Sequence, residues 1–434
     1  MEDLGELMDQ LVALPVSGDA FLLRRSGRVI LVDGGRSSVL LSGELTKYGV
    51  DRLDVVICTH ADHDHAGGLV DLLERSKIKV REFWLPGAWA ESLPVLLKNP
   101  AVVVDDLIQT LDQEIHVAPF DADPEEFEER MHSYISGQRD AYRDAERLAD
   151  RDNYKNAERL ADGDDYEKPF IPIEEQRSVG PLDAELPEDR PAEERAARAF
   201  RNGRGRIRYR VAKKKVSKTV ASFWLGLIDT AERIHAIAVQ AMRHGVKVRW
   251  FDFGEFARTD RSGGGDRGFL IPLNAVELAT PPPPPVGLSF LVRLTPVNEE
   301  CLVFLSPASK DYWLGPSILF TGDSPLGKGK NYSASWLRWP TEASRYVVAT
   351  APHHGSESNL AAYNHISNEV KVICWVRSGG NASHPGPTYR RIDPSLRICT
   401  NCPRTKKPRQ AAEIHFSKRP IWFPMRTHGH RCSC

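Results

Sequence analysis

The sequence lacks the features that mark membrane and secreted proteins. No uninterrupted apolar stretch in the 434 residues reaches the roughly 18–20 residues that a membrane helix needs. The first residues, Met1 to Glu6, are acidic where a secretory leader would be basic. Seven cysteines, an odd number in a long chain, favour reduced thiols over a disulfide framework. We therefore expect a cytoplasmic protein without a membrane partner.

The sequence also lacks a net charge of either sign. Its 58 basic and 59 acidic residues leave a formal net charge of −1, which gives no overall attraction to polyanions. A hydrophobic content of 41% and a charged content of 27% are ordinary for a globular protein. A chain of this length can hold one large domain with an insertion, or two domains. Any attraction to a charged partner must therefore be local.

What the sequence does contain is a dense group of metal-binding side chains. The apolar, β-branched run from Asp54 to Thr59 predicts a buried strand, and His60-Ala61-Asp62-His63-Asp64-His65-Ala66-Gly67-Gly68 follows it directly. In an extended chain residues 60, 62 and 64 point to one side. They can then converge on one metal ion, while His65 reaches a second ion about 3.5–4 Å away. His63 is expected to face elsewhere. The spacing predicts a two-metal hydrolase.

This stretch resembles the T-H-x-H-x-D-H-x-G-G motif of the metallo-β-lactamase superfamily. Asp62 stands where that motif has its second histidine, and H-x-D-x-D-H is similar to the ComEC-type branch, the hydrolase domain of DNA-uptake proteins. Further family motifs follow in the expected order, namely Gly18-Asp19-Ala20 with Val29 to Gly35, Asn298 with Cys301 to Phe304, Leu319 to Ser324, Ala351 to Ser356, and Ser378 to Asn381 with His384-Pro385. The resemblance covers roughly residues 14–90 and 219–395.

The resemblance implies a fold and a role for each motif residue. The fold would be an α/β (α+β) metallo-β-lactamase-like αββα four-layer sandwich. His60, Asp62 and one later histidine would hold the first ion, with Asp64 and His65 on the second. Asp323 would bridge both ions, and His354 is preferred over His353 as a direct ligand. Asp64, Asp33 and His384 would be the catalytic residues. Asp33 would orient a metal-binding histidine, and His384 would be a metal ligand or a donor to a substrate phosphate oxygen.

Two divalent ions explain why no protein nucleophile is required. Side by side they share a water, lower its pKa toward neutrality as a bridging hydroxide, and stabilise charge on the attacked group. Replacing an imidazole by Asp62 adds negative charge and hard oxygen. That change moves the preference from strictly zinc toward manganese or magnesium. We expect two divalent ions, zinc or manganese.

Changes in composition divide the chain into four segments. Residues 1–118 and 219–395 would form the two halves of the sandwich, and 119–218 a charged, partly helical or disordered insertion. Within the insertion a six-residue sequence at 145–150 recurs at 157–162, and an acidic, proline-containing linker covers 181–194. Helical spacing of apolar residues predicts a core helix over 219–244. The prolines at 281–285 predict a stiff spacer or a site for a protein partner.

Residues 396–434 form a basic tail that contains cysteine and histidine. A C-x₂-C pair with a distant second pair is a zinc pattern, although C-x-C is not its common second half. The tail could therefore be a small zinc module or a basic segment with free thiols. The residues concerned are Cys399, Cys402, Cys432 and Cys434.

The motifs predict hydrolysis, and the substrate must be inferred from other features. The ComEC-type pattern and the basic segments 201–218 and 390–434 favour a phosphodiesterase or nuclease acting on DNA. Tyr209 could add base stacking. The candidate nucleic-acid contacts are Arg204, Arg206, Arg208, Arg210, Lys213, Lys214 and Lys215. The alternatives are a hydrolase of a small lactone, thioester, cyclic nucleotide or phosphoester, and a non-catalytic adaptor in a multi-protein assembly such as a defence system, with partners bound through the insertion or the prolines.

Overall fold

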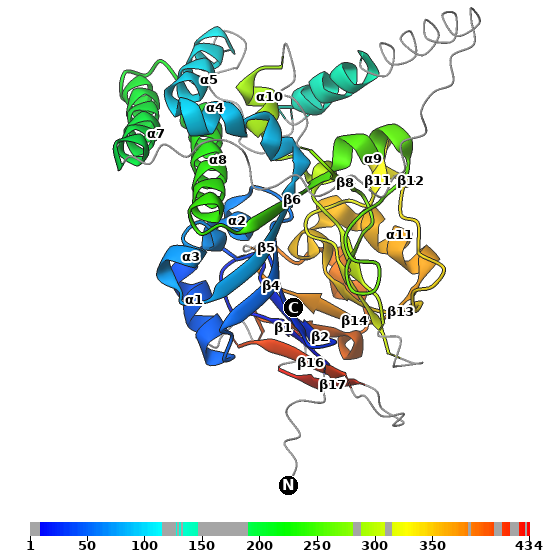
Figure 1. The fold of residues 1–434 in the computed structure, drawn as a ribbon. Helices are drawn as coiled ribbons and strands as arrows, with labels where there is room; N and C mark the ends of the chain where they lie inside the picture. Colours follow the sequence, from blue (N-terminus) through cyan, green and yellow to red (C-terminus); the bar gives the residue numbers. More distant parts are fainter. Residues whose placement is uncertain are drawn as a thin grey trace, which may run out of the picture.

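Two β-sheets pack face to face and carry helices on their outer sides in a computed structural model of the chain (Figure 1). The structure describes residues 9–114, 127, 130–131, 133–145, 190–280, 288–308, 315–380, 383–402, 410–416, 425–429 and 432–434. The repeated sequence beyond residue 145 and the prolines at 281–285 lie outside these residues. The arrangement confirms the predicted αββα sandwich.

Nine strands of the described chain form the first sheet, in the order β17-β16-β1-β2-β3-β4-β5-β6-β8. From β3 to β6 neighbouring strands are parallel, and the outer pairs are antiparallel. The strands are β1 (Asp9–Ala13), β2 (Phe21–Arg25), β3 (Arg28–Val32), β4 (Arg52–Ile57), β5 (Lys79–Pro86), β6 (Lys247–Asp252), β8 (Val276–Leu278), β16 (Ala412–Phe416) and β17 (Met425–His428).

The second sheet has the strand order β15-β14-β13-β10-β9-β7 in the described residues. Strands β10, β13, β14 and β15 run parallel, and β9 and β7 are antiparallel at the other edge. Its strands are β7 (Ile271–Pro272), β9 (Phe304–Ser306), β10 (Ser317–Phe320), β13 (Tyr346–Thr350), β14 (Lys371–Arg377) and β15 (Arg397–Cys399), and a separate ribbon pairs β11 (Gly327–Lys328) with β12 (Ala334–Ser335).

Three apolar layers hold the four structural layers together. The middle layer joins the two sheets and includes Ile57 and Trp84 from the first and Phe304 and Val348 from the second. The outer layers lie between each sheet and its helices. The helices are α1 (Ser38–Lys47), α2 (His63–Ala66), α3 (Leu72–Arg75), α4 (Leu93–Lys98), α5 (Pro100–Glu114), α7 (Arg190–Ala212), α8 (Lys218–Arg243), α9 (Phe253–Thr259), α10 (Phe290–Leu294), α11 (Leu360–Glu369) and α12 (Pro387–Arg391).

Short 3₁₀ turns connect many of these elements at the strand ends. They are η2 (Gly67–Leu69), η3 (Gly87–Glu91), η5 (Asn298–Glu300), η6 (Lys330–Tyr332), η7 (Pro352–Gly355), η8 (Glu357–Asn359) and η9 (Pro394–Leu396). Of these, η2 and η7 belong to two of the sequence motifs. Two of the sequence motifs therefore lie in turns, where side chains can leave the sheets.

Helices α7 and α8 correct one expectation and confirm another. Helix α8 covers the predicted core helix over 219–244. The linker expected at 181–194 is wrong for its last residues, because α7 begins at Arg190. A stripe of small and apolar residues, Ala196, Phe200 and Ile207, is buried along α7. That stripe packs the helix onto α5 and α8, so burial outweighs the polar composition that predicted a linker.

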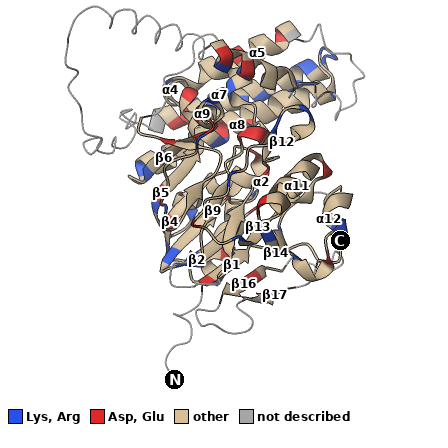
Figure 2. Ribbon diagram, turned by 90° about the vertical axis from the view of Figure 1, so that its right-hand side faces the viewer, with Lys and Arg blue, Asp and Glu red and all other residues tan. Residues whose placement is uncertain are grey.

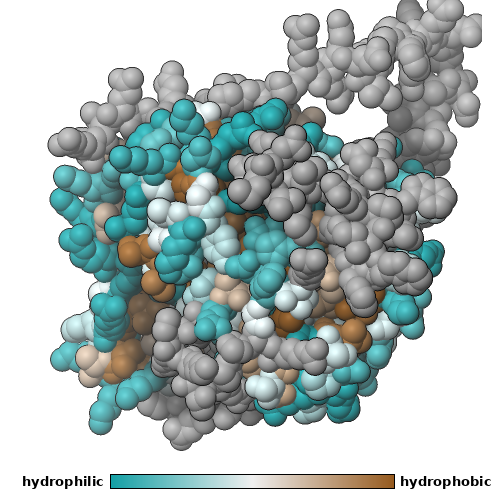
Figure 3. Space-filling view, turned by 90° about the horizontal axis from the view of Figure 1, so that it is seen from below, coloured by the Kyte–Doolittle hydropathy of each residue, from teal (hydrophilic) through white to brown (hydrophobic). Residues whose placement is uncertain are grey.

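Residues beyond 395 contribute strands to both sheets. Strand β15 extends the second sheet beside β14, whereas β16 pairs with β1 in the first sheet. Seen from below, where β16 and β17 lie, hydrophilic residues surround several separate hydrophobic groups (Figure 3). Among the helices in the described ranges, none is both long enough and apolar enough to cross a membrane.

Candidate metal centre

The motif residues meet at the carboxyl ends of parallel strands from both sheets. Asp33 follows β3, and His60 follows β4 three residues after its end. Across the interface Asp323 follows β10, and His353 and His354 follow β13. Parallel strands end at the same edge of their sheet, so these turns are brought together from positions about 300 residues apart in sequence. The edge is therefore a natural place for a composite site.

Backbone hydrogen bonds lock the turns of the first sheet to one another. The amide of Asp19 donates to the carbonyl of Asp64, at 2.8 Å, and the amide of Gly68 donates to the carbonyl of Gly35, at 2.7 Å. Gly18 has a φ of +97°, and a Cβ on it would lie 2.0 Å from the Asp64 carbonyl oxygen. A Cβ on Gly68 would lie 1.9 Å from the carbonyl oxygen of Gly34. These glycines are required by close approach, which holds the motif rigidly.

The chain leaves β4 extended only as far as Asp62. Helix α2 begins at His63, and the amides of His65 and Ala66 donate to the carbonyl of Asp62. The expected extended course through residue 64 is therefore wrong, because Asp64 and His65 stand on the first turn of a helix. His63 is exposed and lies outside both candidate metal clusters, as predicted.

One half of the centre consists of His60, Asp62 and one oxygen of Asp323. The Nε2 atom of His60 lies 3.4 Å from Asp62 Oδ2 and 3.6 Å from Asp323 Oδ2. The Nε2 atom of His353 lies 3.5 Å from the same Asp323 oxygen. The later histidine in this half is thus His353, which is partly exposed, with 26% of its side-chain surface accessible.

The other half consists of His65, Asp64, His354 and the second oxygen of Asp323. His65 Nε2 lies 3.1 Å from Asp323 Oδ1, and His354 Nε2 lies 3.3 Å from Asp64 Oδ2. His65 and His354 are buried, and their rings are 5.2 Å apart between centroids. Asp323 therefore stands between two sets of histidine and aspartate atoms and turns one oxygen toward each.

Two aspartates fix the tautomers of the histidines in this second half. His65 Nδ1 lies 2.8 Å from Asp33 Oδ2, and His354 Nδ1 lies 3.0 Å from Asp19 Oδ1. An ionised carboxylate can only accept hydrogen bonds, so both Nδ1 atoms donate, and in the neutral form of each ring Nε2 then carries the lone pair that a metal ion can bind. Asp33 also accepts from the amide and the hydroxyl of Thr59, each at 2.8 Å. Its position is thereby fixed independently of His65.

The electrostatics of the centre favour bound positive charge. Burial alone would raise the pKa of Asp323. The nearby histidines His65 and His353 lower it by more than burial raises it, so the pKa lies well below its usual range. Burial lowers the pKa of His354, yet Asp19 and Asp323 raise it to about 10. The carboxylates thus remain ionised and retain protons on neighbouring imidazoles. A divalent cation would supply the same positive charge without those protons.

Several buried atoms of the centre have no hydrogen-bond partner within the described part of the chain. They are His60 Nε2, His65 Nε2 and Asp323 Oδ1. Each is a preferred ligand atom for zinc or manganese. The ligand atoms of His60, Asp62 and Asp323, and likewise those of Asp19, His65, Asp323 and His354, lie within 4.8 Å of one another. An unpartnered buried polar atom is costly, so the residues present fit two divalent ions.

His384 lies beside the centre rather than in either cluster. Its ring centroid is 5.5 Å from that of His353 and 6.0 Å from that of His354. Burial and the two neighbouring histidines lower its pKa to about 4. His384 is therefore a neutral imidazole at neutral pH, in reach of a group bound at the centre.

The residues predicted to contact nucleic acid lie on α7 and on the turn that follows it. Basic and acidic residues alternate over α5, α7 and α8 (Figure 2). Arg204 forms ion pairs with Asp229 and Glu232 of α8. Arg206 and Arg210 pair with Asp105 and Asp112 of α5, respectively. Arg208 and the lysines at 213–215 are exposed.

A pocket of about 570 Å³ opens beside His60. Its described lining includes four arginines and four acids, among them Glu91, Arg139, Arg143 and Glu300, and no residue of 201–218. Arg139 and Arg143 form ion pairs with Glu300. The pocket is thus close to neutral overall and is separate from the basic segment.

Glu91 in this pocket gives a pH-dependent stability that can be measured. Burial, with Glu300 and Asp252 nearby, raises its pKa from 4.5 to about 7. The pKa of Glu91 is higher in the folded than in the unfolded protein, so ionisation of Glu91 destabilises the fold. This destabilisation is absent below pH 4.5, where Glu91 is protonated in both states, and complete above pH 7. Relative to Glu91→Gln, the wild type should lose up to about 3 kcal/mol of unfolding free energy over that range. Denaturation at pH 5 and pH 8 measures this, with exposed Glu194→Gln as the control; a difference independent of pH would contradict it.

Sequence reasoning assigned no role to Asp19 or Cys301. The Cys301 thiol lies 3.5 Å from His60 Nδ1 and accepts a hydrogen bond from the Asp323 amide at 3.1 Å. It therefore links both halves of the sandwich behind the centre. The signal for Asp19 was present, because an aspartate between apolar residues at the start of a sandwich needs a buried partner.

Comparison with known proteins is informative for the first part of the chain. A search of the curated proteins finds no match. Residues 13–95 match the family model described as the Metallo-beta-lactamase superfamily, and this range contains Asp19, Asp33 and the whole motif from His60 to Gly68. The match over residues 13–95, the sandwich fold and the two clusters of candidate ligands together fit a metal-dependent hydrolase.

Proposed function

We propose that the protein is a two-metal phosphodiesterase that cleaves nucleic acid, with DNA as the leading substrate. The observation that carries this proposal is the Asp323 carboxylate, which faces His60 with one oxygen and His65 with the other. Two bound divalent ions would activate a shared water and stabilise charge on the attacked phosphate. His60, Asp62 and His353 would hold one ion, and Asp64, His65 and His354 the other.

The charge of the ligand set favours an anionic substrate over a neutral one. Three carboxylates, Asp62, Asp64 and Asp323, offset three of the four positive charges of two divalent ions and leave a charge of +1 while the shared water is still protonated. A phosphodiester carries one negative charge and would neutralise the centre. A third carboxylate in place of an imidazole also suits manganese, which accepts hard oxygen ligands. The same replacement, at Asp62, is the feature that resembles the ComEC-type branch.

His384 is proposed to act on the substrate rather than to hold an ion. Its neutral imidazole lies beside His353 and His354 without belonging to either ligand cluster. It can donate a hydrogen bond to a phosphate oxygen, and that bond would strengthen as charge develops there. We further propose a cytoplasmic location, where buried thiols such as Cys58 and Cys301 remain reduced.

The direct test uses labelled single- and double-stranded DNA with manganese. The wild type should cleave at least one of them, and Asp64→Ala should abolish cleavage because it removes a ligand and the partner of His354 Nε2. Asp51→Ala, at an exposed aspartate before β4, is the matched control and should retain full activity. Absence of cleavage, or cleavage that survives Asp64→Ala, contradicts the proposal.

A second candidate is a hydrolase of a small phosphodiester or phosphoester. The ion pairs of Arg204, Arg206 and Arg210 with acids of α5 and α8 favour it, because paired arginines are less available to DNA. A small aryl phosphodiester would then be cleaved by the wild type, whereas DNA would not. Cleavage of the small substrate should depend on Asp64 in the same way as DNA cleavage would, since the chemistry is the same.

The lysines at 213–215 distinguish the two candidates. They are exposed at the end of α7, and changing all three to glutamine removes charge while keeping the length of the side chains. For a nuclease, the KM for DNA should rise roughly 10-fold at moderate salt, and its salt dependence should weaken. The control removes three exposed lysines elsewhere, Lys77, Lys79 and Lys98. Equal effects of the two triple variants would count against DNA binding through this segment.

A further inference from the structure

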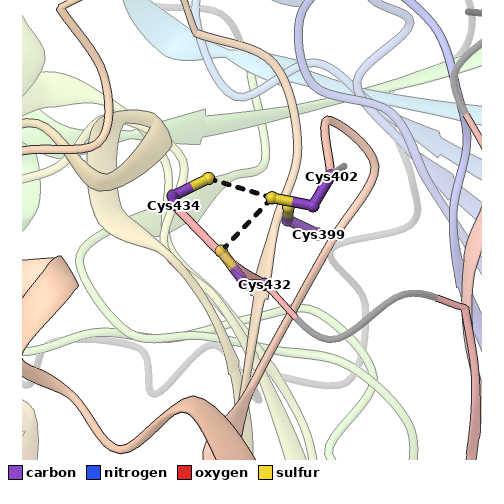
Figure 4. Close-up of side chains that lie close together, drawn as sticks. All are labelled: Cys399, Cys402, Cys432 and Cys434. Atoms are coloured by element: carbon purple, nitrogen blue, oxygen red, sulfur yellow. Dashed lines mark hydrogen bonds between the residues drawn. The ribbon is translucent and has the colours of Figure 1, made fainter. Parts of the chain in front are cut away.

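Four cysteines converge at the carboxyl end of β15, the edge strand of the second sheet, and none of them belongs to the histidine and aspartate clusters of the candidate metal centre. Cys399 ends β15, Cys402 follows three residues later, and Cys432 and Cys434 come from the end of the chain. Their side chains turn toward one another (Figure 4). The sulfur of Cys402 lies 4.0 Å from that of Cys432 and 3.1 Å from that of Cys434. All four sulfurs lie within 4.8 Å of one another.

We propose that Cys399, Cys402, Cys432 and Cys434 bind a structural zinc ion that fastens the last residues of this chain to β15. Zinc in structural sites is tetrahedral, with Zn–S bonds of about 2.3 Å, so its sulfurs stand about 3.8 Å apart. The observed distances bracket that value. A cluster with two irons would hold its two cysteine pairs farther apart, which favours a single ion.

A buried arginine beside the four cysteines would balance the negative charge of a zinc ion bound by thiolates. Arg377, on β14, is 2% exposed, and among the described residues its guanidinium donates to the carbonyls of His354 and Gly379 and forms an ion pair with no carboxylate. Its NH1 lies 3.5 Å from the Cys434 sulfur, and in the strand register Arg377 pairs with Cys399. Zinc with four thiolates carries a charge of −2. A buried charge needs a partner, and zinc thiolate would supply it for Arg377.

The site also lies where the end of the chain meets β15 and β14. The amide of Cys432 donates to the Arg397 carbonyl at 3.1 Å, and the amide of Thr400 donates to the Arg377 carbonyl at 3.1 Å. Arg377 Nε donates to the His354 carbonyl at 2.7 Å. Arg377 therefore touches both the Cys434 sulfur and the turn that carries His354. The role of the zinc site is structural, because its four positions are all filled by sulfur and none is open to substrate.

The experiment measures metal in the purified full-length protein and in cobalt-substituted protein. Cobalt bound by thiolates gives a sulfur-to-metal charge-transfer absorption that nitrogen and oxygen ligands do not give. The wild type and Asp64→Ala should both show this absorption and about one zinc per chain that resists mild chelation. Cys402→Ser should lose both signals, whereas Cys374→Ser, which removes a buried thiol of β14 outside the cluster, should keep them.

A second variant guards against misfolding. Cys434 is the least buried of the four, so Cys434→Ser should fold, lose zinc and melt roughly 5 °C lower than the wild type. Iron instead of zinc, a disulfide among the four cysteines, or no thiolate–cobalt absorption in the wild type would overturn the proposal. Because Asp64→Ala keeps the signal, failure of the proposed hydrolase and failure of this site are distinguishable.

Discussion

Replacing Asp323 by asparagine is expected to lower the rate of phosphodiester cleavage by roughly 10³-fold or more. Asp323 is 3% exposed and faces ligand atoms on both sides, His65 Nε2 at 3.1 Å and His60 Nε2 at 3.6 Å. An asparagine keeps the shape but loses the negative charge, and its amide nitrogen would point a donor at one of the two ions. The loss should therefore affect both halves of the centre together.

Metal binding provides the readout that separates this effect from simple unfolding. Asp323→Asn should bind fewer than two ions, or bind the second at least about 10-fold more weakly, while its circular dichroism stays native. Asp260→Asn, at an exposed aspartate that ends α9, is the matched control. If Asp323→Asn kept both ions and most of its activity, Asp323 would not bridge the centre.

The local half of this site could be predicted from the sequence. His60, Asp62, Asp64 and His65 are close in the chain, and any compact turn after a buried strand brings them together. Their convergence therefore depends little on the rest of the fold. The prediction still assumed the wrong backbone, because the helical turn that begins at His63 depends on hydrogen bonds to the Asp62 carbonyl that a spacing argument does not include.

The long-range half could be predicted only through motif resemblance. Asp19 and His354 are separated by 335 residues and meet because β2 and β13 belong to different sheets that pack together. No periodicity connects them. The same holds for Cys301, whose thiol reaches His60 across 241 residues. Pairing across two sheets depends on strand order, and the sequence pattern does not encode strand order directly.

Helix α7 illustrates how charge can hide a buried face. Its sequence is rich in arginine, and the composition predicted a linker followed by a basic DNA-binding run. Ala196, Phe200, Gly203 and Ile207 nevertheless recur at helical spacing. A Cβ on Gly203 would lie 2.6 Å from Val104 and 2.9 Å from Ile228, so the helix packs very closely onto its neighbours. The arginines around that stripe then find acids on α5 and α8.

Removing the two carboxylates that orient histidines should impair the centre almost as strongly as removing a ligand. Asp33 now accepts from three donors with two oxygens, namely the Thr59 amide, the Thr59 hydroxyl and His65 Nδ1. In Asp33→Asn only one oxygen remains to accept them. His65 would then favour the tautomer with its proton on Nε2, the atom that faces Asp323 Oδ1 at 3.1 Å. Such a proton blocks metal binding. Asp19→Asn should act in the same direction on His354 but more weakly, because the Ser378 carbonyl oxygen also lies 3.2 Å from His354 Nδ1.

Each single change is expected to lower metal affinity or turnover by about 10–100-fold, and the double variant by up to about 10⁴-fold if the two histidines act independently. Isothermal titration calorimetry measures the metal affinity, and an activity assay at saturating metal measures the turnover. Asp54→Asn is the matched control, because Asp54 is also buried and accepts a hydrogen bond from the Val29 amide at 2.9 Å without touching a histidine. If Asp33 and Asp19 had a purely structural role, Asp54→Asn would be equally harmful. If they orient the histidines, Asp54→Asn keeps its metal affinity, and excess metal partly restores turnover in Asp33→Asn and Asp19→Asn.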